Sequence, residues 1–279
     1  MKNSILFIFL ILFNATVLGQ EKEKIKGTKI VTVEQKEVKP FENLEVEDNL
    51  EIFLIKGDKC GVEIEADDNL HDIIDINVNG SVLQLSSTKE VISSKKFSVR
   101  VTYTDNFKMI IAKDKSNITA LAEMDLSDFT FKTFDESKLF AYVKTKNFTL
   151  MANDKSKIEL NLKSDQATIE LSKNSRLKAL ISSSQLTFDM YQKTNAVIEG
   201  DAINLKLRLD NNAEFLGKNL SSKNAEITSE GYANCSIQVN TKAIIDASGK
   251  SEIQLYGTQK IDLRNFIDSA TLYKKPLNK

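Results

Sequence analysis

A repeat of about 19 residues, visible from residue 108 onward, constrains this chain more than any other feature. A small residue marks each copy at a fixed anchor position. The anchors are Ser116, Ser137, Ser156, Ser175, Thr194, Ala213, Ala233, Ser251 and Ser269, which follow one another at intervals of 18 to 21 residues. A chain with so short a period builds a stack of similar units, because no single unit can enclose a core of its own.

Three apolar columns keep register with the anchors. Six residues before each anchor stand Ile110, Phe131, Leu150, Ile169, Phe188, Leu207, Ile227, Ile245 and Leu263. The other two columns lie eight residues before the anchor and two residues after it, with exceptions only at Lys108 and Thr271. Apolar side chains at alternate positions, with polar residues between them, indicate β-strands that bury one face. A helical repeat would need apolar spacings of three and four.

Each repeat therefore predicts two short strands that meet at a polar corner. Stacking such coils at the inter-strand spacing of about 4.8 Å buries one continuous apolar column. We predict a parallel β-helix over residues 106–279, with one coil for each of the nine anchors and a length of roughly 40 Å. The six-residue period typical of left-handed β-helices is not visible, so we expect the right-handed form.

Residues 20–105 are rich in alternating apolar and charged residues but do not follow the repeat. Asn79-Gly80 separates two such runs and predicts a hairpin turn. Because the bare end of a solenoid exposes unpaired strands and open core, we interpret this segment as an N-terminal β-rich cap. At the other end, Lys274, Lys275 and Pro276 are residues that discourage further strand pairing.

The first 19 residues have the pattern of a secretory signal peptide. Lys2 precedes an apolar run from Ile5 to Phe13, and small residues lead to Gly19. The run is shorter than the roughly 20 residues of a bilayer span. We therefore expect cleavage after Gly19, export, and a mature chain without a transmembrane segment. The final location would be the periplasm, the outer-membrane surface or the medium.

Composition narrows the function. The net charge of −1 argues against nucleic-acid binding, which typically requires a basic excess. With 2 Cys and 1 His in the whole chain, zinc clusters, a disulfide framework and most His-dependent catalysis are poorly supported. We expect Cys60 and Cys235 to remain unpaired and His71 to be a surface histidine in a polar turn, and no cofactor is predicted.

Several segments together resemble a known family. They are Phe41–Val46, Leu50–Leu54, Asp68–Leu70, Asn79–Leu83 and Ala247–Ile253. In combination they are similar to the auto-transporter adhesin head domain called GIN, a domain of unknown function common in Bacteroidota. The resemblance covers roughly residues 30–270. It implies a secreted or envelope β-helix protein with an adhesin-like role, and it carries over no catalytic residues.

Two surface columns could carry chemistry. Asp114, Asp135 and Asp154 would stand side by side on successive coils, where stacked carboxylates can recruit Ca²⁺. The adjoining column of Lys115, Glu136 and Lys155 can instead neutralise them as a solvated charge ladder. We prefer the charge ladder.

The second column contains Glu170, Asp189 and Arg208 on consecutive coils. Two carboxylates beside an arginine are typical of sites that cleave or bind acidic sugars. General acid catalysis also needs one carboxyl held neutral by burial or by a like charge, and an adjacent arginine opposes that. A surface salt-bridge ladder is the simpler interpretation.

We therefore predict a non-enzymatic envelope protein that presents long polar faces for adhesion or scaffolding. Cell-surface glycans or envelope proteins are the expected partners. The alternative is a polysaccharide lyase or hydrolase that uses Glu170, Asp189 and Arg208. The residues alone identify neither the ligand nor the oligomeric state.

Overall fold

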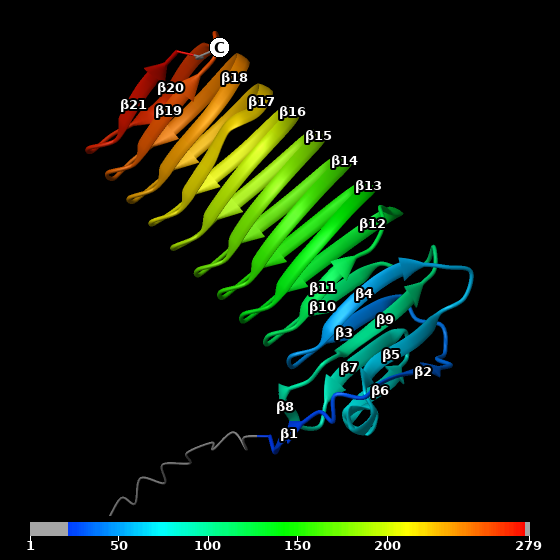
Figure 1. Cartoon of the computed structure of the whole chain (residues 1–279). Coiled ribbons are helices and arrows are strands. Elements are labelled where there is room, and N and C mark those ends of the chain that lie inside the picture. The colour runs from blue at the N-terminus through cyan, green and yellow to red at the C-terminus, as the bar shows by residue number, and fades with distance from the viewer. Residues whose placement is uncertain (1–21, 277–279) are drawn as a thin grey trace, which may run out of the picture.

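The computed structural model describes residues 22–276, so the predicted signal peptide lies outside the described residues. Nearly every segment is a β-strand, and the strands stack along one rod (Figure 1). The repeat region comprises β10 (Met109–Ala112), β11 (Asn117–Ala120), β12 (Met124–Thr133), β13 (Lys138–Ala152), β14 (Lys157–Leu171), β15 (Arg176–Met190), β16 (Asn195–Leu209), β17 (Glu214–Ser229), β18 (Asn234–Ala247), β19 (Glu252–Tyr256), β20 (Lys260–Phe266) and β21 (Thr271–Lys275). Within residues 22–276, no helix is long and apolar enough to cross a membrane.

Parallel pairing between successive coils confirms the predicted β-solenoid. Leu150 pairs with Ile169, Ile169 with Phe188, and Phe188 with Leu207, each 19 residues further along the chain. All four side chains are at most 1% exposed. The core is therefore one vertical apolar column, as the repeat predicts, and the right-handed sense of the coil stays a prediction.

The corner of each coil is a tight turn around a buried anchor. Ser116 donates its backbone N–H to the carbonyl of Lys113 at 3.1 Å, and its hydroxyl donates to the same carbonyl at 2.7 Å. Because Ser116 is fully buried, the interior of the corner admits only a small side chain. Two residues earlier, Asp114 has a φ of 54°, in the left-handed region that Asp, Asn and Gly tolerate best.

The stack extends into the segment that the sequence assigns to the cap. β3 (Asn43–Val46) pairs in parallel with β10, and β4 (Glu51–Lys56) pairs in parallel with β11. β7 (Val82–Ser87) and β9 (Phe97–Tyr103) add to β3 and β4 in the same sense. The repeat is invisible here because the chain between β4 and β10 interrupts its period with cap strands.

The remaining N-terminal elements close this end of the rod. β2 (Val31–Lys36) pairs antiparallel with β5 (Gly61–Asp67), and β5 pairs antiparallel with β9. β6 (Ile74–Asn79) and β7 form the predicted hairpin, whose turn contains Gly80 at a φ of 59°. The short helix η1 (Asp68–Ile73) joins β5 to β6, and β1 (Lys24–Lys26) pairs with β8 (Glu90–Ser93).

Asp67 ties the cap together from a fully buried position. Its carboxylate accepts backbone N–H groups from Lys29, Lys95 and Lys96 at 2.9 to 3.1 Å. Burial raises the pKa of this carboxyl, but the three hydrogen bonds outweigh burial and leave the pKa lowered. Gly27 packs so closely that a Cβ there would lie 2.0 Å from Asp67 Oδ2. Asp67 therefore joins three segments that are distant in sequence.

Candidate functional site

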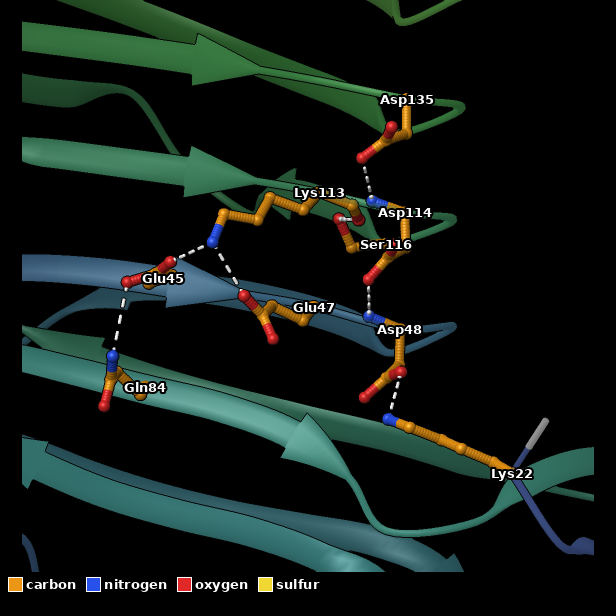
Figure 2. Close-up of polar contacts among 9 residues, drawn as sticks. All are labelled: Lys22, Glu45, Glu47, Asp48, Gln84, Lys113, Asp114, Ser116 and Asp135. Atoms are coloured by element: carbon orange, nitrogen blue, oxygen red, sulfur yellow. Dashed lines mark hydrogen bonds and ion pairs between the residues drawn. The ribbon is translucent and has the colours of Figure 1, made fainter. Parts of the chain in front are cut away.

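The predicted aspartate column exists and is one residue longer than the sequence indicates. Asp48, Asp114 and Asp135 lie above one another at successive corners (Figure 2). Asp154 continues the column on the next coil. The backbone N–H of Asp48 donates to Asp114 Oδ2 at 2.8 Å, and that of Asp114 donates to Asp135 Oδ2 at 3.1 Å. The N–H of Asp135 donates to Asp154 Oδ2 at 3.4 Å. Each carboxylate thus ties its own corner to the preceding one.

Lysines close both ends of this aspartate ladder. Lys22 Nζ contacts Asp48 at the cap, as Figure 2 shows, and Lys173 Nζ lies 2.6 Å from Asp154 Oδ1. The hydrogen bond from Lys173 lowers the pKa of Asp154. In the part of the chain that the structure describes, no three His, Cys, Asp or Glu side chains are grouped as metal ligands. Calcium binding at Asp114, Asp135 and Asp154 therefore stays a hypothesis, while the observed contacts are those of a structural ladder.

The neighbouring charges pair among themselves. Lys155 Nζ lies 3.2 Å from Glu136 Oε1, and this hydrogen bond lowers the pKa of Glu136. Closer to the cap, Lys113 Nζ bridges Glu45 and Glu47 (Figure 2). Hydrogen bonds to these carboxylates raise the pKa of Lys113. The sequence gives no sign of the Lys113 network, because its acids lie more than 60 residues away.

The column of Glu170, Asp189 and Arg208 is assembled as predicted, since the three residues are register partners on β14, β15 and β16. Arg208, however, has its ion-pair partner elsewhere, with Nη2 3.9 Å from Glu230 Oε2, and its guanidinium carbon lies 5.8 Å from the Tyr191 ring centre. All three side chains stand on the outward side of their strands, where water reaches them. Their catalytic use stays a hypothesis.

An aromatic-lined groove on the outer face of β13 to β16 is the feature that sequence reasoning missed. Phe140 and Tyr142 are 40% and 44% exposed, and Leu180 is 50% exposed. The two rings make an edge contact, with centroids 6.0 Å apart and planes at 73°. The groove has a volume of about 360 Å³ and is lined by Phe140, Ala141, Tyr142, Glu159, Leu160, Asn161, Lys178, Ala179, Leu180, Val197 and Glu199. We call this set the aromatic groove.

The strand register fixes the arrangement of the aromatic groove. One column runs from Phe140 through Glu159 and Lys178 to Val197. The parallel column reads Tyr142, Asn161, Leu180 and Glu199. Apolar and polar side chains thus lie side by side on a paired sheet. Exposed apolar surface rimmed by polar groups marks interaction sites, and the large rings supply contact area at little cost in conformational entropy.

A stack of similar coils whose side chains form long outward columns defines a solenoid repeat protein. The chain itself belongs to the family described as "Putative auto-transporter adhesin, head GIN domain", whose model matches residues 40–258. The resemblance seen in the sequence is therefore confirmed.

Solved structures share this fold. A putative adhesin from Parabacteroides merdae is 14% identical, with a TM-score of 0.66, and the match covers 92% of this chain and 100% of that one. A putative adhesin from Parabacteroides distasonis is 15% identical, with a TM-score of 0.68 and coverage of 90% and 100%. A putative lipid binding protein from the same species is 10% identical, with a TM-score of 0.53 and coverage of 92% and 100%. No curated protein matches the chain at a significant level.

Proposed function

We propose that this chain is an exported, non-enzymatic protein of the cell envelope that binds surface glycans through its aromatic groove. The observation that carries the proposal is the exposure of Phe140 and Tyr142 on a rigid parallel sheet. A flexible loop could fold such rings inward, but both rings lie on β13, where Phe140 pairs with Thr119 on one side and Glu159 on the other, and Tyr142 pairs with Asn161. The family's adhesin description supports the same role.

The chemistry of the aromatic groove favours a glycan. A sugar ring has an apolar face for an aromatic ring and hydroxyl groups for polar partners. Phe140 and Tyr142 supply the rings, while Glu159, Asn161 and Lys178 supply hydrogen-bond acceptors and donors beside them. The successive coils offer further outward side chains to neighbouring sugars, so weak contacts along one chain can add up.

Binding is tested with the mature chain, residues 20–279, on an array of glycans and matrix proteins. Replacing both rings, Phe140→Ala with Tyr142→Ala, is expected to weaken glycan binding by at least about tenfold, because central aromatic residues dominate such interfaces. Tyr232→Ala is the matched control, since Tyr232 is 58% exposed but does not line the groove. Equal binding by the groove variant and the wild type would refute the proposal.

Export is tested separately. The expected result is that N-terminal sequencing of the protein from its source cells begins at Gln20. Protease treatment of intact cells then distinguishes surface display from a periplasmic location. A mature protein that retains Met1 inside the cell would exclude an adhesive role.

The enzymatic alternative rests on the register of Glu170, Asp189 and Arg208. It predicts that the purified protein shortens acidic polysaccharides and that Asp189→Ala abolishes this activity. We expect no depolymerisation by either protein, because both carboxylates are reached by water and the ion-pair partner of Arg208 is Glu230 rather than either of them.

A further inference from the structure

The C-terminal end of the rod exposes unpaired strand edges. Within residues 22–276, β20 pairs only with β18, and β21 pairs only with β19. Figure 1 shows both strands at the end opposite the cap, beside the C-terminus. Each strand therefore presents a row of backbone N–H and C=O groups, which is a template for another strand.

The core also remains uncovered at this end. Ile245 is fully buried, but its register partner Leu263 on the last coil is 49% exposed. Ile253 is likewise fully buried, while its partner Leu272 is only half-buried. Tyr273 on β21 is 45% exposed. An apolar end of this kind, framed by open strand edges, is typical of an interaction surface.

The lysine expected to protect this edge is turned away from it. Lys274 Nζ donates to Gln259 Oε1 at 2.8 Å and also contacts the carbonyl of Gly257 on the preceding coil. Lys275 Nζ lies 5.2 Å from the ring centre of Tyr273. Both ammonium groups are therefore engaged within the chain.

We propose that two copies of this chain join at their C-terminal ends about a twofold axis, with β20 pairing antiparallel to the partner's β20. If Leu263 lies at the centre of that pairing, Asp262 stands opposite the partner's Arg264, and the same contact recurs on the other side of the axis. Such a self-complementary pattern is what a twofold interface requires. Arg264 is the extra residue of a β-bulge, a feature that re-aims side chains at sheet edges.

A second copy fits better than a growing filament of the same chain. Head-to-tail stacking would place the open end against the cap, where β5, β7 and β9 each already pair with a strand on both edges. The charges of β20 can also be rearranged. Asp262 lies 3.9 Å from Lys242, and Arg264 lies 3.1 Å from Glu226, with every one of these side chains at least 45% exposed. Exposed pairs of this kind contribute little, so exchanging partners costs little.

The test measures the mass of the mature chain by light scattering and sedimentation, from about 1 to about 100 μM. We expect twice the monomer mass at the upper end of this range. Leu263→Asp should give a monomer with an unchanged circular dichroism spectrum. Leu216→Asp, which alters a 40% exposed residue away from this end, should remain a dimer. A wild type that is monomeric at every concentration would overturn the proposal, as would a dimer that survives Leu263→Asp.

Charge reversal tests the register independently of the folding of any one variant. Asp262→Arg and Arg264→Asp should each give monomers, because each places like charges opposite one another twice. Mixing the two variants should restore dimers, since every facing pair then has opposite charges. The double variant Asp262→Arg with Arg264→Asp should also dimerise. Failure of both the mixture and the double variant would refute this pairing, whatever the glycan array shows.

Discussion

The two ends of this solenoid differ in how the apolar core of the terminal coil is covered. At the N-terminal end, antiparallel strands cover the first coil, and Leu44, Ile52 and Val99 are all fully buried. At the C-terminal end, Leu263 occupies an equivalent core position but is 49% exposed. Within the stack, each inner coil is covered by the coils above and below it, but the first and the last coil each lack one such neighbour. The cap strands cover the first coil, and the proposed second copy covers the last one.

The largest expected effect contrasts two neighbours in one core column. Ile245→Asp should prevent folding, because a buried unpaired charge costs more than about 4 kcal/mol. Leu263→Asp, one coil further on, should cost less than about 1 kcal/mol, because Leu263 is already 49% exposed. Urea unfolding of the two variants at low protein concentration provides the measurement. Equal losses would mean that the two ends are equally closed.

Hydrogen exchange distinguishes the ends without any mutation. The amides of β20 and β21 should exchange far faster than those of β3 and β4, because one edge of each terminal strand is open and its coil is poorly buried. Raising the protein concentration should slow β20 and β21 and leave β3 and β4 unchanged. Mass spectrometry of peptides resolves both regions, and equal protection at low concentration would contradict the comparison.

An intermediate effect concerns the acid stability of the capped end. The folded pKa of Asp67 lies below its usual value of 3.8, so its stabilising effect is present above that pH and is lost as the pH falls through the folded pKa. Asp67→Asn should lower the Tm at pH 7 and flatten its dependence on pH below about 4. Thermal melts from pH 7 to pH 2 provide the measurement. A variant whose acid profile matches that of the wild type would exclude Asp67 as the cause.

The smallest expected effect lies on the side of the rod, far from either end. Lys155→Ala removes the contact with Glu136, but the lysine side chain is 69% exposed. Exposed pairs contribute little to stability, so the Tm should not change measurably. A clear drop in Tm would show that the charge ladder contributes to the stability of the middle coils.

The core of the fold could be predicted because each buried position recurs. Leu150, Ile169 and Phe188 occupy equivalent buried positions on successive coils, so their spacing in the sequence gives the length of one coil. The adjacency of Glu170 and Asp189 follows from the same register. Asp48 escaped prediction as a member of the aspartate ladder, because the cap strands between β4 and β10 hide the period at the first coil.

The candidate site was harder to predict for a different reason. Outward positions are free of packing constraints, so Phe140 and Tyr142 break no pattern that the sequence could reveal. Their signal is the occurrence of two rings at outward positions where the next coil has Glu159 and Asn161. That contrast becomes informative only after the register is known, since only then can inward and outward residues be separated.

The constant 19-residue register of β13 to β16 also bears on how such proteins change over evolutionary time. Each coil in this stretch pairs with the coil before it and the coil after it, so duplicating a segment such as residues 157–175 would lengthen the rod by about 4.8 Å without a new turn or a new core. The length of the rod and of its outward columns can therefore change with the number of repeat copies, while the sequences of the two ends stay the same.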